Sequence, residues 1–147
     1  MRRNKGFTLI ELLVVIAIIG LLSSVVMASL NSARDKGKKA AVQSNLTQLM
    51  SSVELAYGEL GDYSTVCANA TVDRHYEAAK SAAGVTDDIA TEATLQTNTT
   101  AACKDDVTTW VVSVPVKNGV NEYFCVDSAG RKALMVNPLA AAAIQCP

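Results

Sequence analysis

Aromatic residues and histidine are scarce in this sequence. Phe, Trp and Tyr together make up 5% of the 147 residues, and His75 is the only histidine. A chain of this length can form one modest domain but not two. Because the remaining apolar side chains are mostly small, the core of that domain would be thin and would benefit from covalent cross-links.

Patterns typical of catalytic and metal sites are also missing. There is no G-x-S-x-G string, and no two cysteines are spaced as C-x-x-C, which argues against a nucleophile elbow and against zinc. The pairs Asp87–Asp88 and Asp105–Asp106 lack the spaced acidic loop of a calcium site, so solvated loop charge explains them better. We therefore expect no enzyme activity, no metal and no cofactor.

Positive charge is sparse in the C-terminal part of the chain. From Gly61 onward there are six Lys or Arg residues and ten Asp or Glu residues, a net charge of −4. Nucleic-acid binding depends on clustered cations that neutralise phosphates. Nucleic acid is thus an unlikely partner.

Charge is almost absent from residues 7–30, where Glu11 is the single ionisable side chain. A helix of that length spans roughly 36 Å, enough to cross a hydrocarbon core of about 30 Å. We expect residues 7–30 to form a transmembrane helix.

The helix is predicted to continue beyond the apolar run. Residues 31–41 are polar and basic, and steps of three and four then separate the apolar residues Val42, Leu46, Leu49, Met50, Val53, Ala56, Tyr57 and Leu60. Such steps mark one face of a helix. We expect a single helix from Phe7 to Gly58, amphipathic over residues 31–60, followed by a separate head over residues 61–147.

All four cysteines, Cys67, Cys103, Cys125 and Cys146, lie in this head. An even number in an exported domain favours two disulfides. Three pairings are possible, and Cys67–Cys103 with Cys125–Cys146 closes the shortest loops. Each bridge would stabilise the fold by about 3–4 kcal/mol by restricting the unfolded chain.

The first part of the head is predicted to contain one short helix. Asp73 could cap a helix over Arg74–Ala83, and Gly84 would end it. Residues 85–106 read as irregular polar loop.

Strand signals follow. Residues 110–116 and 120–126 flank Asn118–Gly119, a pair typical of two-residue hairpins, and residues 133–136 offer a third strand. Pro115 indicates an unpaired edge or a bulge in its strand. The resulting fold class is α+β, with a long N-terminal helix packed on about three antiparallel strands.

The N-terminus carries the most specific pattern: the basic leader Met1-Arg-Arg-Asn-Lys-Gly6, then Phe7-Thr8-Leu9-Ile10-Glu11. It resembles the signal sequence of type IV pilins and type II secretion pseudopilins, and the resemblance covers about 25 to 30 residues. It implies that a prepilin peptidase recognises Thr8, Leu9 and Ile10, cleaves between Gly6 and Phe7, and N-methylates Phe7. It also implies the pilin-like fold predicted above.

Glu11 is the residue that this resemblance explains best. A carboxylate inside a membrane costs about 2.5–3.5 kcal/mol on insertion scales. Cleavage after Gly6 would create a cationic amine at Phe7, four residues away on the same helical face. Glu11 could pair with its own amine or with that of a neighbouring subunit, which would set the register of assembly.

The resemblance further implies a location and partners. The leader would be cytoplasmic and the head extracytoplasmic, and the subunit would later join an extracellular or periplasmic filament. Its partners would be membrane lipid, the prepilin peptidase, other pilin or pseudopilin subunits and an inner-membrane assembly platform. The last cysteine pair resembles the C-terminal loop staple of many pilin heads.

The sequence also fits other interpretations of the N-terminal segment and of the function. An ordinary secretory signal would be cleaved after Ala28, before Ser29. A type II secretion pseudopilin, a minor or competence pilin with a binding head, and a membrane-anchored enzyme are the functional alternatives. The basic stretch Arg34–Lys39 could lie at lipid headgroups or pair with acidic residues of neighbouring subunits.

Overall fold

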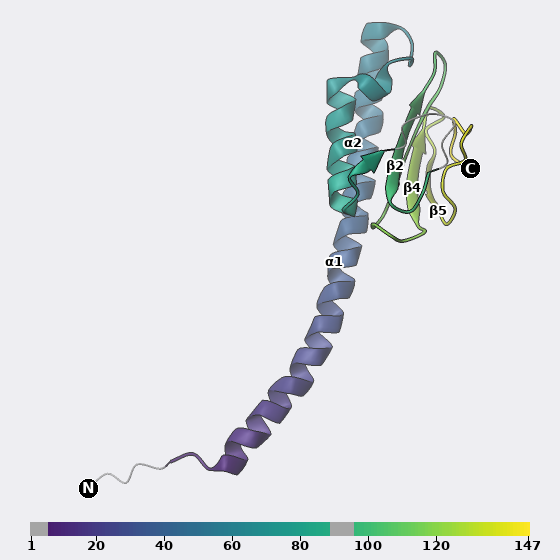
Figure 1. Ribbon diagram of the computed structural model, residues 1–147. Coiled ribbons are helices and arrows are strands. Elements are labelled where there is room, and N and C mark those ends of the chain that lie inside the picture. The colour runs from purple at the N-terminus through teal and green to yellow at the C-terminus, as the bar shows by residue number, and fades with distance from the viewer. Residues whose placement is uncertain (1–5, 89–95) are drawn as a thin grey trace. The chain divides into compact units, whose positions relative to one another are not determined.

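The computed structural model describes residues 6–88 and 96–147 (Figure 1). The leader residues 1–5 and part of the predicted loop 85–106 fall outside the described residues. The chain divides into two units, residues 1–36 and residues 37–147.

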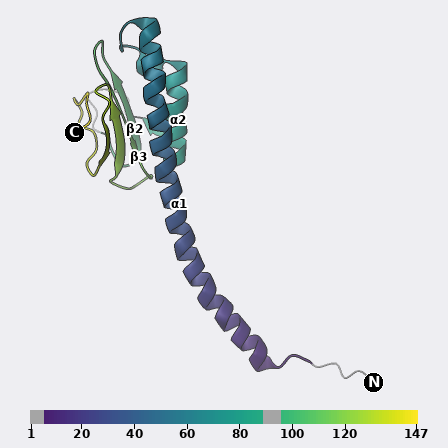
Figure 2. The same cartoon turned by 180° about the vertical axis from the view of Figure 1, so that it is seen from behind.

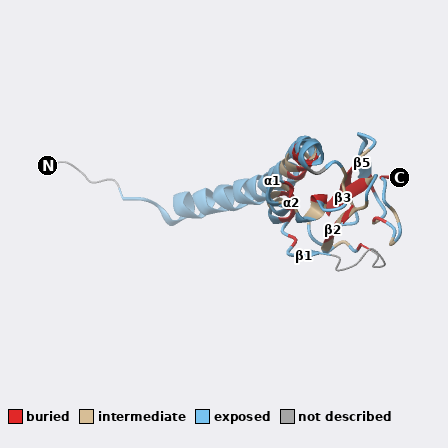
Figure 3. Cartoon of the chain, turned by 90° about the horizontal axis from the view of Figure 1, so that it is seen from above, coloured by how far each residue is buried: buried red, intermediate tan, exposed pale blue. Residues whose placement is uncertain are grey.

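The first unit contains the N-terminal part of helix α1, which runs over Leu9–Leu60. Every described residue from Gly6 to Lys38 is exposed, as the pale colour of this segment in Figure 3 shows. The large apolar side chains from Phe7 to Leu30 are 42–83% exposed. A helix that is apolar on all sides needs a covering of lipid or of other helices, and α1 is long and apolar enough to cross a membrane.

In the second unit, the C-terminal half of α1 packs against helix α2 and a sheet (Figure 2). Fully or almost fully buried positions recur on one face of α1: Val42, Leu46, Leu49, Val53 and Ala56. This is the predicted apolar stripe. Tyr57 departs from it, since it is 40% exposed and its ring centroid lies 4.5 Å from that of Tyr63.

The predicted short helix begins earlier than expected. Helix α2 covers Ala70–Ala83, and its N-cap is Asn69, whose side-chain oxygen accepts the backbone N–H groups of Thr71 and Val72. The prediction of Asp73 as the cap was wrong, because the Asn69 side chain already satisfies the first free N–H groups of the helix. Gly84 ends α2 as predicted, with a φ of 76° that suits glycine. A short 3₁₀ helix, η1 (Val66–Ala68), precedes α2.

Within the described part of the chain the sheet has five strands, where about three were predicted. Its spatial order follows the chain: β1 (Asp87–Asp88), β2 (Thr100–Asp105), β3 (Trp110–Pro115), β4 (Tyr123–Asp127) and β5 (Lys132–Met135). Strands β2 to β5 are antiparallel, while β1 and β2 are parallel. The α+β, pilin-like fold class is confirmed, but β1 and β2 lie within residues predicted to be irregular loop.

Strands β3 and β4 are buried on both faces. One face contributes Trp110, Val112 and Val114 to the main core beneath α1 and α2. The other contributes Val111, Tyr123 and Cys125 to a smaller core that includes Leu139 and Cys146 of the C-terminal segment. The sheet is therefore the middle layer between the helices and the C-terminal segment.

The prediction of a two-residue hairpin at Asn118–Gly119 was wrong. Strands β3 and β4 are joined by residues 116–122, and Gly119 alone has positive φ there, within a turn closed by the Val120 N–H and the Lys117 carbonyl. Asn118 instead donates its backbone N–H to Ala83 and its side-chain amide to Gly84. These carbonyls lie at the end of α2 and lack helical partners, so the loop satisfies them.

Pro115 fits the expected position at an unpaired edge. It is the last residue of β3 and pairs with Tyr123 of β4, while the β2–β3 ladder stops at Ala102 and Ser113. Proline has no N–H to donate, and within the described residues the β2–β3 ladder gives Pro115 no partner.

Candidate functional site

The N-terminal segment Gly6–Glu11 is the candidate processing and assembly site. Gly6, Phe7 and Thr8 precede the first helical residue, Leu9, so the Gly6–Phe7 peptide bond lies outside the helix. Phe7 is 83% exposed, and apart from the two neighbouring residues no atom lies within 4 Å of the position that a Cβ on Gly6 would take. A protease requires such an open, non-helical bond.

Thr8 and Glu11 form a reciprocal cap at the start of α1. The Thr8 backbone N–H and hydroxyl donate to Glu11 Oε2 at 2.8 Å and 2.7 Å. In return, the Glu11 backbone N–H donates to Thr8 Oγ1 at 3.2 Å. This is a capping box, which satisfies free N–H groups in the first turn of a helix.

The sequence contained the signal for this cap, because Thr8-Leu9-Ile10-Glu11 is a [ST]-x-x-[DE] string directly before an apolar run. The resemblance to prepilin signals implied only peptidase recognition for Thr8 and only an assembly role for Glu11. The structure brings the two side chains together. Leu9 and Ile10, the other two residues assigned to peptidase recognition, are 78% and 74% exposed. The hydrogen bonds of the cap join only Thr8 and Glu11.

The four cysteines form two disulfides in the head. Cys67 pairs with Cys103, and Cys125 pairs with Cys146, which is the pairing that loop length favours. The first bridge joins η1 to β2, and the second joins β4 to the C-terminal segment. Both close loops of a length that restricts the unfolded chain substantially.

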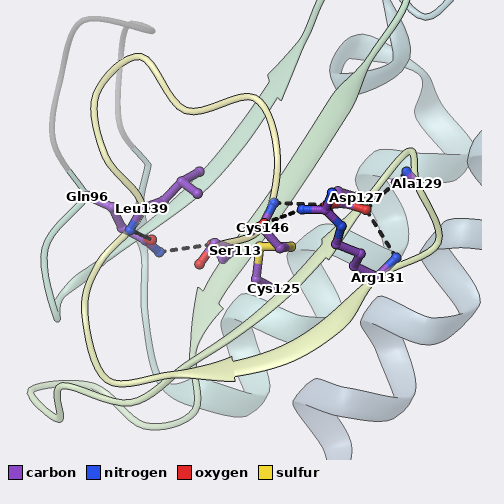
Figure 4. The surroundings of a disulfide bond; sticks show 8 residues. All are labelled: Gln96, Ser113, Cys125, Asp127, Ala129, Arg131, Leu139 and Cys146. Carbon is purple, nitrogen blue, oxygen red and sulfur yellow. Dashed lines mark hydrogen bonds and ion pairs between the residues drawn. A yellow bond between two sulfur atoms is a disulfide. The ribbon is translucent and has the colours of Figure 1, made fainter.

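A buried carboxylate organises the surroundings of the second bridge (Figure 4). Asp127 is fully buried and accepts three backbone N–H groups: Oδ1 those of Ala129 at 3.0 Å and Arg131 at 3.1 Å, and Oδ2 that of Cys146 at 2.9 Å. The Arg131 guanidinium donates to the Cys146 carbonyl at 2.8 Å. Asp127 and Arg131 thus hold both backbone groups of Cys146.

Two further polar side chains fix the C-terminal segment. Gln96 is fully buried, accepts the Leu139 N–H at 3.1 Å and donates to the Ser113 carbonyl at 3.0 Å. Lys104 is 3% exposed, and its ammonium donates to the carbonyls of Ala140 and Ala141. Sequence reasoning identified neither, because their acceptors are backbone groups far away in the chain.

Lys80 and Tyr76 are buried ionisable residues of the head whose partners are other side chains of the fold. Lys80 is 3% exposed and pairs with Glu77 at 2.6 Å and Asp88 at 2.7 Å. Burial opposes the charge of Lys80, but the two carboxylates outweigh it and raise its pKa. Burial, together with a 2.6 Å hydrogen bond to Asp88, raises the pKa of Tyr76 strongly. No group of three or more His, Cys, Asp or Glu side chains suited to a metal occurs in residues 6–88 and 96–147.

The similarity of this chain to a known protein family lies at the N-terminus. Residues 1–27 match the family model of the prokaryotic N-terminal methylation motif. The exposed Gly6–Phe7 bond and the capped start of the apolar helix thus lie within the segment that matches this motif.

Individual relatives are pilins and pseudopilins. The chain is 36% identical over 62 residues to the type IV major pilin protein PilA of Myxococcus xanthus, covering 42% of this chain and 28% of that protein. It is 38% identical over 55 residues to the type II secretion system core protein G of Klebsiella pneumoniae, covering 37% and 39%. It is 44% identical over 55 residues to the type IV wide pilus major component PilA4 of Thermus thermophilus, covering 37% and 42%.

The matched regions span less than half of each of these relatives. No solved structure matches the chain. The suspected resemblance to type IV pilins and type II secretion pseudopilins is confirmed in the N-terminal motif and in the relatives found.

Proposed function

We propose that this chain is a prepilin, the precursor of a structural subunit of a type IV pilus or pilus-like filament. A prepilin peptidase would cleave the Gly6–Phe7 bond and methylate the new amine of Phe7. The mature subunit would then pack its apolar helix against those of other subunits. The observation that carries the proposal is the open Gly6–Phe7 bond directly before a capped helix whose first part, residues 9–30, is apolar and exposed.

The arrangement at Glu11 supports an assembly role. In the precursor, the carboxylate is satisfied by Thr8, which reduces the cost of placing it in a membrane. Cleavage would add a cationic amine at Phe7, and a carboxylate in a low-dielectric environment attracts such a partner strongly. Pairing of Glu11 with the amine of a neighbouring subunit would add one polar contact to an otherwise apolar helix bundle, and this contact would fix the register in which the helices pack.

Processing is tested by co-expressing the full chain with a prepilin peptidase and determining the mature N-terminus by mass spectrometry. We expect N-methylated Phe7. A Gly6→Leu variant should remain uncleaved, and because a Cβ on Gly6 would meet no atom beyond the neighbouring residues, its fold should be unaffected. A mature chain that begins at Ser29 would instead identify an ordinary secretory signal and refute the proposal.

The charge and the capping function of Glu11 can be separated. Glu11→Gln keeps an oxygen that can accept from Thr8, and glutamine also suits a capping box, but it removes the charge. Glu11→Val removes both. If charge pairing drives assembly, neither variant should form filaments in cells that carry the assembly system, although both should insert. Normal filaments from Glu11→Gln would show that the cap, and not the charge, matters.

A pseudopilin of a type II secretion system is the second candidate, because core protein G of that system is among the relatives. The genomic neighbours would distinguish the two candidates: a retraction ATPase beside an assembly ATPase indicates a pilus, and a secretin with exoprotein genes indicates secretion. A minor or competence pilin with a binding head is less favoured, because the head is acidic.

A further inference from the structure

Three exposed cations follow the apolar segment of α1. Arg34, Lys36 and Lys38 lie on the helix surface with only Asp35 as a nearby acid in the sequence. We propose that these three side chains, here called the basic collar, bind the phosphates of anionic lipid headgroups. The inference rests on the proposed residence of the apolar helix in a membrane.

The spacing along α1 places the basic collar at the depth of the lipid headgroups. From Leu9 to Leu30 the helix rises about 32 Å, which matches a hydrocarbon core of about 30 Å. Arg34 lies about 6 Å beyond Leu30 along the axis, at the depth of the headgroup layer. Lys38 starts one turn further on, but side chains of a helix lean towards its N-terminus and long cationic stems extend readily. The Lys38 ammonium can therefore reach back to the same layer.

The three cationic side chains of the basic collar point in different directions around the helix, which favours a bilayer as the partner. At about 100° per residue, Lys36 points to nearly the opposite side of the helix from Arg34, whereas Lys38 lies about 40° from Arg34. A protein partner on one side of the helix would meet only part of this set. A bilayer surrounds the helix and offers acceptors in every direction, and the Arg34 guanidinium can bind a phosphate through two N–H groups.

Lys39 helps to define where the collar ends. Its ammonium pairs with Glu122 in the loop between β3 and β4, and both side chains are about one-third exposed. Lys39 therefore serves the fold of the head. The cations on its N-terminal side, from Arg34 to Lys38, are the ones available to a surface outside the chain.

The test uses the full chain reconstituted in phosphatidylcholine vesicles with and without phosphatidylglycerol. Spin-labelled phosphatidylglycerol and spin-labelled phosphatidylcholine, compared by electron paramagnetic resonance, report which lipid contacts the protein. Each cation at an anionic surface is worth about a fivefold preference. We expect the unaltered chain to prefer phosphatidylglycerol at least several-fold and to lose much of that preference in high salt.

The variant R34Q/K36Q/K38Q should show nearly equal contact with both lipids. The double variant R34Q/K38Q should lose part of the preference, and R74Q/K132Q, which removes one exposed arginine and one exposed lysine from the head, should retain it. An unchanged preference in the triple variant would overturn the proposal. The proposal would also be overturned if the main defect of the triple variant were reduced cross-linking between copies of the chain in pure phosphatidylcholine. That result would assign the cations to contacts with a second copy of the chain.

Resistance to carbonate extraction, measured first, separates this proposal from the proposed function. A chain that is extracted does not span the bilayer, which refutes the proposed membrane residence and the collar together. A chain that resists extraction but shows no preference for phosphatidylglycerol refutes the collar alone.

Discussion

Replacing Asp127 by asparagine should weaken the head substantially, because this carboxylate is fully buried and accepts three backbone N–H groups. Asparagine can keep the two bonds to Ala129 and Arg131 through its oxygen. Its amide group then faces the Cys146 N–H, so that donor loses its acceptor and two donors oppose each other.

The size of the effect follows from these contacts. A hydrogen bond to a charged group contributes about 1.5–3 kcal/mol, and a buried donor without a partner costs about 1–3 kcal/mol. Because the lost bond and the unpaired donor are partly the same loss, we expect Asp127→Asn to lower the free energy of unfolding by about 2–4 kcal/mol. The Arg131 guanidinium also loses its nearby charge, 3.9 Å away.

Urea unfolding of the oxidised, detergent-solubilised chain measures this change. Trp110 is the only tryptophan and is 1% exposed in the main core, so its fluorescence reports unfolding of the head without a label. The matched control is Asp106→Asn. Asp106 also accepts backbone N–H groups, from Thr108 and Thr109, but it is only half-buried, in the loop between β2 and β3. Equal midpoints for the two variants would refute the reasoning that burial makes Asp127 special.

Three further predictions use the same fluorescence assay. Tyr76→Phe should cost about 1 kcal/mol at neutral pH through the lost bond to Asp88. It should also reduce the loss of stability at alkaline pH. The raised pKa of Tyr76 keeps its proton in the folded chain, while the unfolded chain releases it above pH 10, so the free energy of unfolding falls by up to about 1.4 kcal/mol per pH unit. An unchanged slope in the variant would contradict this. Ser113→Ala should be neutral or stabilising by up to about 1 kcal/mol, since the Ser113 hydroxyl is buried without a partner among the described residues, and a clear loss of stability would point to a missed acceptor. Leu46→Ala should cost about 2–5 kcal/mol by leaving a cavity beneath the sheet, and a loss below 1 kcal/mol would mean that the core closes around it.

Periodic features of the chain could be predicted from the sequence. The apolar steps from Val42 to Ala56 place these residues on one helical face whatever packs against them, and that face is buried. Gly84 could be predicted as a helix end because few other residues adopt its positive φ. Both signals are local, so a single sequence contains them in full.

Features that depend on tertiary contacts could not be predicted. Residues 100–105 have modest strand propensity and become β2 because β3 offers a ladder and Cys103 is bonded to Cys67. Asn118–Gly119 is a strong hairpin signal, yet the loop instead satisfies the end of α2. At the candidate site, Thr8–Glu11 is a capping string in the sequence, but Thr8 was interpreted only as a peptidase-recognition residue and Glu11 only as a charge for assembly.

The position of the Thr8 cap has a consequence for proteolysis. Thr8 and Glu11 both lie on the C-terminal side of the Gly6–Phe7 bond, and their three hydrogen bonds involve no atom of residues 1–6. Loss of those residues would therefore leave the first turn of α1 intact while removing three cationic side chains and exposing a new amine. Such a cut would change the electrostatics of the N-terminus without any refolding, so a subunit could be matured while its helix stays embedded.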